Sequence, residues 1–262
     1  MTKTSLGVLI SSIILSACST TSDIQAVKPP LSFAQISEQV KQANVVILTD
    51  HTLSTDLNLS SGGAQGRERD FIDPAAKVFA KQLQTQGLSY TILKVEELID
   101  SGKITTKEQF TLAYKNYDKL LQQAVSEGDT LISLHFDADI IMAEDYKGKE
   151  LYIGGVQIIL DERAVSNETF KLSYFLLNDY PLFSSLKEAG FRVRPGYEFE
   201  PRYQSNLTLN ITGHSTGGGI LLELAPQEQA IRLYGTAART AQALEPSLAI
   251  LAKSVADFRR GL

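Results

Sequence analysis

The sequence predicts an α/β protein with a mixed, mostly parallel central sheet flanked by helices on both faces. Short apolar runs rich in β-branched residues, such as residues 45–48 and 130–134, alternate with longer segments whose apolar residues recur every three or four positions. The short runs are typical of buried strands and the longer segments of amphipathic helices. Strands that alternate with helices form parallel sheets, which bind ligands beyond the carboxyl ends of their strands.

Each expected strand is a short apolar run bounded by polar residues, glycine or proline. The run at 151–160 is broken by Gly154 and Gly155, and the run at 191–194 is brief. Residues 194–204 are rich in glycine, proline and aromatic residues, which predicts a surface loop. The full set of expected strands is 45–48, 90–95, 130–134, 151–160, 191–194 and 220–224.

The expected helices combine helical spacing of apolar residues with start and stop signals. Asp73 and Pro74 suit the first turn of a helix that ends at Gly87. The full set of expected helices is 73–86, 106–126, 167–177, 182–189, 226–244 and 246–260.

The first residues have the features of a bacterial lipoprotein signal peptide. Lys3 is followed by an apolar stretch, residues 6–15, which is too short to span a bilayer. The stretch ends in Leu15-Ser16-Ala17-Cys18, which resembles a lipobox and implies cleavage before a lipidated Cys18. Because Ser19 follows Cys18, the resemblance implies sorting to the outer membrane, with the lipid anchor holding the protein on the periplasmic face.

These features divide the sequence into three parts. We expect a signal peptide over residues 1–17, a lipidated cysteine and polar tether over 18–31, and one folded domain over 32–262.

Composition limits the classes of partner. The formal net charge of the chain is −5, and it becomes about −6 once the segment that contains Lys3 is removed. A nucleic-acid-binding protein is expected to carry a basic face, so we expect no nucleic-acid partner. Cys18 is the single cysteine, so the lipidated chain would have no disulfide and would depend on a hydrophobic core for stability.

Polar residues just beyond two expected strands predict a metal site. His51 and His135 each stand there, in a chain that has three histidines, and Glu68 and Asp70 lie between them near a helix start. Two imidazoles and one carboxylate, with a fourth position left for water, are the ligands of a catalytic zinc ion. The residues alone leave open whether Glu68 or Asp70 supplies the carboxylate.

Four segments follow the order strand-end histidine, glutamate near a helix start, strand-end histidine and late strand ending in glutamate. They are Thr49-Asp50-His51, Gly63-Ala64-Gln65-Gly66-Arg67-Glu68, Gly128-Asp129-Thr130-Leu131-Ile132-Ser133-Leu134-His135-Phe136-Asp137-Ala138 and Ile220-Leu221-Leu222-Glu223-Leu224. Together they resemble the zinc-dependent N-acetylmuramoyl-L-alanine amidases that cleave peptidoglycan. The resemblance implies that His51, Glu68 and His135 bind zinc and that Glu223 is the catalytic carboxylate, with peptidoglycan or muropeptides as substrate.

The chain departs from the usual family pattern at three places, which predicts a divergent member. Asp50-His51-Thr52-Leu53 stands where the family has Gly-His-Gly-Gly. Asp137 replaces the family's asparagine after the third ligand, and Leu224-Ala225-Pro226 replaces its Gly-Phe.

The chemistry of amide cleavage gives these residue types a reason. Zinc lowers the pKa of a bound water to about 7, and a neighbouring carboxylate can move a proton from water to the leaving amine. Glu223 interrupts an apolar run, and a buried charge is costly unless it is paired or near a metal. A structural salt bridge is the alternative role for Glu223.

A competing motif is Gly213-His214-Ser215-Thr216-Gly217, which fits the Gly-x-Ser-x-Gly of serine esterases and follows a strand-like stretch at 207–211. Those enzymes place the triad histidine after the serine, and no histidine follows His214. The other interpretation of residues 213–219 is a loop beside the site, where His214 would contact substrate.

Two further functions would use the same residues. One is a zinc amidohydrolase acting on a small N-acyl amino acid. The other is a non-catalytic lipoprotein that binds peptidoglycan or regulates another hydrolase. The need for a protein activator is left open.

Overall fold

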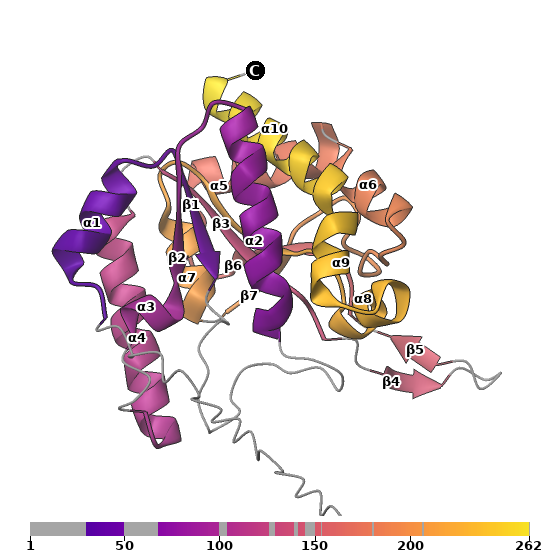
Figure 1. Cartoon of the computed structure of the whole chain (residues 1–262), viewed down its shortest axis with the longest axis horizontal. Helices are drawn as coiled ribbons and strands as arrows, with labels where there is room; N and C mark the ends of the chain where they lie inside the picture. Colours follow the sequence, from indigo (N-terminus) through magenta and orange to yellow (C-terminus); the bar gives the residue numbers. More distant parts are fainter. Residues whose placement is uncertain are drawn as a thin grey trace, which may run out of the picture.

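The computed structural model describes residues 30–49, 68–99, 104–125, 129–138, 141–144, 150–152, 154–179, 181–205 and 207–261. The predictions for Cys18, for His51 and for residues 1–29 lie outside these ranges. Figure 1 shows a central sheet with helices packed on both sides, which confirms the predicted fold class. No helix in the described ranges combines the length and apolar character that a bilayer span requires.

The main sheet has six strands in the order β2-β1-β3-β8-β6-β7. The first four of these are parallel to one another, whereas β6 runs antiparallel to β8 and parallel to β7. The strands are β2 (Tyr90–Lys94), β1 (Val45–Thr49), β3 (Thr130–His135), β8 (Gly219–Glu223), β6 (Gln157–Asp161) and β7 (Arg202–Gln204). The carboxyl ends of β1, β3 and β8 therefore meet at one edge, where the amino end of β6 also lies.

The expected strand at 151–160 is wrong as a single element. Its first part is β5 (Glu150–Tyr152), which pairs with β4 (Ile141–Glu144) in a separate two-stranded sheet. Gly154 and Gly155 lie between this part and β6, and Gly155 packs so closely on the segment of Arg194 that a Cβ there would lie 2.5 Å from the backbone nitrogen of Arg194. The expected loop at 194–204 ends in the short edge strand β7, and residues 191–194 contribute only a bridge between Val156 and Val193.

One face of the sheet carries the larger hydrophobic core, and α2 and α10 cross it side by side (Figure 1). The elements whose residues build this side are α2 (Glu68–Thr85), α5 (Asn167–Tyr174) with a π-helical turn (Phe175–Asp179), α6 (Leu182–Glu188), α8 (Gln227–Tyr234), α9 (Ala237–Ala243) and α10 (Glu245–Arg260). The expected helix at 226–244 is wrong as one helix. Gly235, at φ 77°, ends α8, and the side chain of Thr236 caps α9.

The expected start of the helix at 73–86 is also wrong, because α2 begins at Glu68 and contains Pro74. Proline cannot donate to the carbonyl four residues earlier, so α2 loses one hydrogen bond. The added turn buries Phe71 and Ile72 in the core, and a buried side chain of this size stabilises by about 1.5–3 kcal/mol. This burial offsets the lost bond and places Glu68 at the amino end of the helix.

The opposite face is covered by α1 (Phe33–Lys41), α3 (Val95–Leu98), α4 (Lys107–Ala124) and α7 (Leu207–His214). The strand-like interpretation of 207–211 is wrong, because these residues belong to the helix α7. Leu209 packs with the sheet residues Ile159 and Leu221, whereas Ile211 belongs to the core beneath α4. A helix wedged between two apolar surfaces buries residues on both sides, so its sequence imitates a strand.

Candidate metal centre

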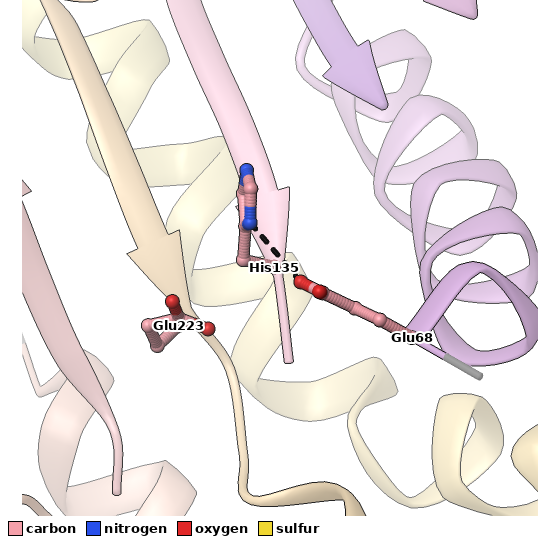
Figure 2. A group of neighbouring side chains, drawn as sticks. All are labelled: Glu68, His135 and Glu223. Atoms are coloured by element: carbon pink, nitrogen blue, oxygen red, sulfur yellow. Dashed lines mark ion pairs between the residues drawn. The ribbon is translucent and has the colours of Figure 1, made fainter. Parts of the chain in front are cut away.

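Three side chains from separate elements meet at the carboxyl edge of β3 and β8. Glu68, His135 and Glu223 each offer one ligand atom, and these atoms all lie within 4.8 Å of one another. Figure 2 shows Glu68 at the start of its helix, His135 at the end of β3 and Glu223 at the end of the neighbouring strand. Among the described residues this is the group of histidine, cysteine, aspartate and glutamate side chains that could hold a metal ion.

His135 is held between two polar side chains. Its Nδ1 lies 3.0 Å from Oε1 of Glu68, and its Nε2 lies 3.0 Å from Oγ of Ser133, two residues earlier on the same strand. The side chain is only 4% exposed. With a metal ion bound, an Nε2–H that donates to Ser133 would leave the lone pair of Nδ1 for the metal beside Glu68, which is how neighbouring groups fix the tautomer of a metal-binding histidine.

Packing and a backbone hydrogen bond both fix Glu68, which is 2% exposed. Phe71, one turn along α2, packs on Phe136 with ring centroids 5.2 Å apart, so the helix start is held against the end of β3. Oε1 of Glu68 accepts a hydrogen bond from the backbone nitrogen of Phe136 at 3.0 Å. A buried carboxylate needs such partners, because leaving it unsatisfied would cost several kcal/mol.

Glu223 ends β8 directly beside His135. The two residues are register partners in the parallel pair of β3 and β8, so their side chains emerge on the same face of the sheet. The backbone nitrogen of Leu224 donates to the carbonyl of His135 at 2.9 Å, which fixes the two strand ends to each other. Glu223 is 9% exposed and therefore mostly withdrawn from water.

The donor set fits a zinc ion. Zinc binds histidine nitrogen at about 2.0–2.1 Å and carboxylate oxygen at about 2.0–2.2 Å, so tetrahedral ligands lie about 3.4 Å apart. The observed 3.0 Å between Nδ1 of His135 and Oε1 of Glu68 is close to that separation. The imidazole of His135 and the carboxylates of Glu68 and Glu223 are buried together. One further ligand would complete a stable metal site.

The other predicted site residues have different positions. Asp70 is 58% exposed and lies near Arg69, so the structure places Glu68 and not Asp70 beside His135. His51 lies outside the described residues, but β1, the strand before it, is the parallel neighbour of β3 and ends at Thr49.

The Gly-x-Ser-x-Gly segment lies at the opposite edge of the sheet. It joins the end of α7 to the start of β8, about 13 Å from Glu223 along a strand that rises about 3.3 Å per residue. Ser215 is buried, and its hydroxyl donates to the carbonyls of Asp129 at 2.6 Å and Gly218 at 3.2 Å. A nucleophile elbow runs from strand to helix, whereas this segment runs from helix to strand, so Ser215 has a structural role.

His214 likewise takes no part in the cluster. It is exposed, and its Nδ1 lies 2.7 Å from the carbonyl oxygen of Asn210 on the same helix. The expectation that residues 213–219 form a loop beside the site is therefore wrong.

Sequence reasoning missed a second layer of polar residues around the cluster. Gln227 donates to the carbonyl of Phe136 at 2.7 Å from its side chain and to the carbonyl of Asp137 at 2.9 Å from its backbone. Gln157 is the register partner of Glu223 on β6, and its Nε2 donates to Oδ2 of Asp137 at 3.1 Å. Ser133 and Gln157 are polar residues within apolar strands, which is the signal that could have revealed them.

Asp137 is the hub of this layer. Its Oδ2 accepts hydrogen bonds from the Gly155 backbone nitrogen at 3.1 Å and from Gln157, and it lies 3.4 Å from Nη1 of Arg194. Burial raises the pKa of Asp137, and the hydrogen bond from Gly155 and the charge of Arg194 oppose that rise. The residue that departs from the amidase pattern is thus built into the region next to Glu223.

The described fold and cluster define an α/β protein with a candidate metal centre at the carboxyl edge of its sheet. No model of a protein family matches the chain, and no curated protein matches it. Solved structures are similar to it, although only at low sequence identity.

The N-acetylmuramyl-L-alanine amidase Ami1 from Mycobacterium smegmatis has a TM-score of 0.52 at 10% identity, over 84% of this chain and 99% of that one. An N-acetylmuramoyl-L-alanine amidase from Clostridium difficile 630 has a TM-score of 0.46 at 18% identity, over 79% and 95% of the two chains. AmiC2 of Nostoc punctiforme has a TM-score of 0.40 at 14% identity, over 78% and 94%. The likeness to Ami1 shows that the chain has an amidase-like fold.

Proposed function

We propose that this protein hydrolyses the amide bond between N-acetylmuramic acid and L-alanine in peptidoglycan. In this proposal His51, Glu68 and His135 hold a zinc ion, and Glu223 is the catalytic carboxylate. The observation that carries the proposal is the buried cluster of Glu68, His135 and Glu223 at the carboxyl edge of the sheet. The amidase-like fold supports it, because ligands of such sheets bind beyond the carboxyl ends of the strands.

The reaction adds water across the carbonyl–nitrogen bond. The water oxygen forms a bond to the lactyl carbonyl carbon of the muramic acid, and the bond to the alanine nitrogen breaks. Glu223 takes a proton from the attacking water and delivers it to the leaving amine, so the carboxylate is regenerated. When bound, zinc would supply Lewis acidity toward the carbonyl oxygen.

The surrounding residues prepare this arrangement before substrate arrives. Ser133 holds the ring of His135 in one orientation, and the backbone nitrogen of Phe136 holds Glu68. The burial of Glu223 keeps bulk water away, which strengthens its electrostatic interactions with the reacting groups. Because Glu223 also offers a ligand atom to the cluster, metal content and activity are measured on the same variant.

Digestion of purified sacculi by the zinc-loaded full-length chain in detergent tests the proposal. We expect mass spectrometry to find stem peptides with a free amino-terminal L-alanine and glycan strands that lack them. Zinc binding without such products would contradict the proposed substrate, and release of an acid from a small N-acyl amino acid would favour the smaller substrate class.

The proposal also includes the location of the protein in the cell envelope. We propose that Cys18 carries the lipid anchor and that the domain faces the periplasm from the outer membrane, on the basis of the lipobox-like Leu15-Ser16-Ala17-Cys18. Radiolabelled palmitate should enter the chain and be lost in Cys18→Ala, and the wild type should fractionate with outer membranes. A chain that remains unlabelled and is released with periplasmic contents would contradict this part.

A further inference from the structure

We propose that Arg194 recognises a free carboxylate on the peptide side of the scissile amide and so makes the protein selective for acidic stem peptides. The inference rests on the proposed amidase function, because it assigns the ligand group bound next to Glu223. Its supporting observations are the fixed position of Arg194, its partial exposure and the chain of contacts that connects it to Glu223.

Backbone hydrogen bonds hold the segment around Arg194 against Val156, the residue just before β6. The backbone nitrogen of Arg194 donates to the carbonyl of Val156 at 3.0 Å, and that of Val156 donates to the carbonyl of Arg192 at 2.8 Å. Gly155 packs so tightly on this segment that a Cβ would lie 2.5 Å from the nitrogen of Arg194 and 2.8 Å from its Cα. The segment is therefore preorganised, which lowers the entropic cost of ligand binding.

A short series of contacts leads from Arg194 to Glu223. Nη1 of Arg194 lies 3.4 Å from Oδ2 of Asp137, and the same oxygen accepts a hydrogen bond from Nε2 of Gln157. Gln157 is the register partner of Glu223 in the antiparallel pair of β6 and β8. Side chains of directly opposed residues in such a pair have Cβ atoms about 4.5–5.5 Å apart. The guanidinium of Arg194 is thus connected to Glu223 through the side chains of Asp137 and Gln157.

The guanidinium is only partly used by the protein. Its contact with Asp137 is long for a charge-assisted hydrogen bond, which is usually about 2.7–2.9 Å. Within the described ranges, Asp137 is the one carboxylate that forms an ion pair with Arg194, and no other side-chain partner accepts from its guanidinium. The side chain is 17% exposed, so a ligand can reach it. Guanidinium has five donors in a planar fork that matches a carboxylate, so one side of the fork can bind a ligand.

The nearby charges favour an anion. Arg202 also acts on the carboxylate of Asp137, and Arg192 donates through Nε to the carbonyl of Gly154 at 3.0 Å. Arg194 and Arg202 therefore both act on one half-buried carboxylate, and Arg192 lies two residues before Arg194, in a chain whose formal net charge is −5. Glu198, on the same loop, accepts a hydrogen bond from the backbone nitrogen of Gly196 at 3.2 Å.

Gln157 indicates that the anion belongs to a peptide. Its Oε1 is buried and has no hydrogen-bond partner among the residues that the structure describes. A buried acceptor left without a donor costs about 1–3 kcal/mol, so a ligand N–H would be bound favourably there. A peptide offers an N–H and a carboxylate a few bonds apart, whereas a phosphate group offers only acceptors. The ligand class is thus a peptide with a free carboxylate next to L-alanine.

Two muramoyl dipeptides that differ in one group test this inference. N-acetylmuramoyl-L-alanyl-D-glutamate carries a free α-carboxylate on its second residue, whereas the D-isoglutamine compound carries a carboxamide of nearly the same shape at that position. The γ-carboxylate is common to both compounds. We expect the zinc-loaded full-length chain to favour the carboxylate compound about tenfold or more in kcat/KM, since hydrogen bonds to charged groups are the stronger ones. Arg194→Gln should reduce that preference to less than about twofold, and Arg194→Lys should give an intermediate preference because it keeps the charge but loses the fork.

Arg239→Gln is the matched control, because Arg239 is an exposed arginine on α9 with no role in the proposed carboxylate site. It should leave the preference unchanged. A preference that persists in Arg194→Gln, or a wild type that treats both dipeptides equally, would overturn the inference.

Binding measured by calorimetry in the Glu223→Gln background separates this inference from the proposed function. If that protein prefers the carboxylate compound and loses the preference with Arg194→Gln, while the wild type hydrolyses neither compound, the carboxylate site stands and the amidase proposal fails. If the wild type hydrolyses both compounds and neither assay shows a preference, the amidase proposal stands and the carboxylate site fails.

Discussion

The two edges of the sheet each contain a histidine and a serine, but the surroundings of these residues differ. At the carboxyl edge, His135 is buried, and its two ring nitrogens lie against the side chains of Glu68 and Ser133. At the amino edge, His214 is exposed beside a backbone carbonyl, and the hydroxyl of Ser215 donates to the backbone carbonyls of Asp129 and Gly218. The comparison teaches that a site is defined by converging side chains, because the motif at 213–217 has the letters of a catalytic elbow without its geometry.

The largest expected effect is on activity, which a substitution at the carboxyl edge of the sheet should abolish and one at the amino edge should leave intact. Glu223→Gln should lower muropeptide release at least about a thousandfold while zinc content stays near that of the wild type, because the amide keeps the shape but cannot take a proton. Ser215→Ala should retain activity within about twofold, as its hydroxyl bonds to the backbone carbonyls of Asp129 and Gly218 at the far edge of the sheet. Release kinetics and metal analysis on the same preparations check both statements, and an inactive Ser215→Ala that still folds would reverse the assignment.

The next effect separates the two histidines by metal content. His135→Ala should lose most of the bound zinc, because it removes one of few ligands and leaves Glu68 buried beside a cavity. His214→Ala should bind zinc like the wild type. Inductively coupled plasma mass spectrometry after gel filtration measures both, with circular dichroism to verify folding. Equal zinc content in the two variants would contradict the location of the centre.

A smaller effect is expected from the hydroxyl that orients His135. Ser133→Ala should weaken zinc affinity by about tenfold to a hundredfold, which is the usual cost of losing a hydrogen bond to a metal-binding histidine. Ser133→Thr keeps a hydroxyl and should recover part of the affinity. Competition with a chelating dye gives the affinities, and Ser215→Ala is the control for removal of a buried hydroxyl. Unchanged affinity in Ser133→Ala would show that Ser133 does not orient the ring.

The smallest effect concerns stability on the face that carries α7. Burial raises the pKa of Asp118, although a hydrogen bond from Asn210 at 3.1 Å opposes the rise. A carboxyl whose pKa is raised in the folded state favours folding when protonated, and it reduces stability as the pH rises through that pKa.

Asp118→Asn should therefore be more stable than the wild type at pH 7, and this advantage should shrink as the pH falls through the raised pKa of Asp118 toward the usual carboxyl value. Urea unfolding at several pH values measures the difference. An advantage that does not change with pH would show that the charge of Asp118 is not its source.

The sequence predicted the parts of the fold that depend on one local pattern. The strands β1, β3 and β8 are uninterrupted apolar runs, and they lie where expected because a buried parallel strand needs little else. The helix α7 was missed because it contacts two apolar surfaces and so imitates strand alternation. The start of α2 was misplaced because Pro74 is a strong local signal, and the burial of Phe71 and Ile72 outweighs it.

The candidate site also contains residues that could be predicted from the sequence and residues that could not. Glu68, His135 and Glu223 could be named because each stands at the end of a recognisable element. Gln157, Asp137 and Arg194 could not be placed with them, because their contacts depend on the antiparallel register of β6 with β8 and on the close approach of Gly155 to Arg194. Registers of this kind are set by tertiary packing rather than by local spacing.

The most direct test of the central claim is a zinc titration of the chelator-treated full-length protein, with release of L-alanyl peptides from sacculi measured at each step. We expect no release without metal, a rise that ends at about one zinc ion per chain, and no release at any zinc concentration in Glu223→Gln. Release that survives complete removal of metal, or saturated zinc binding without release, would contradict it.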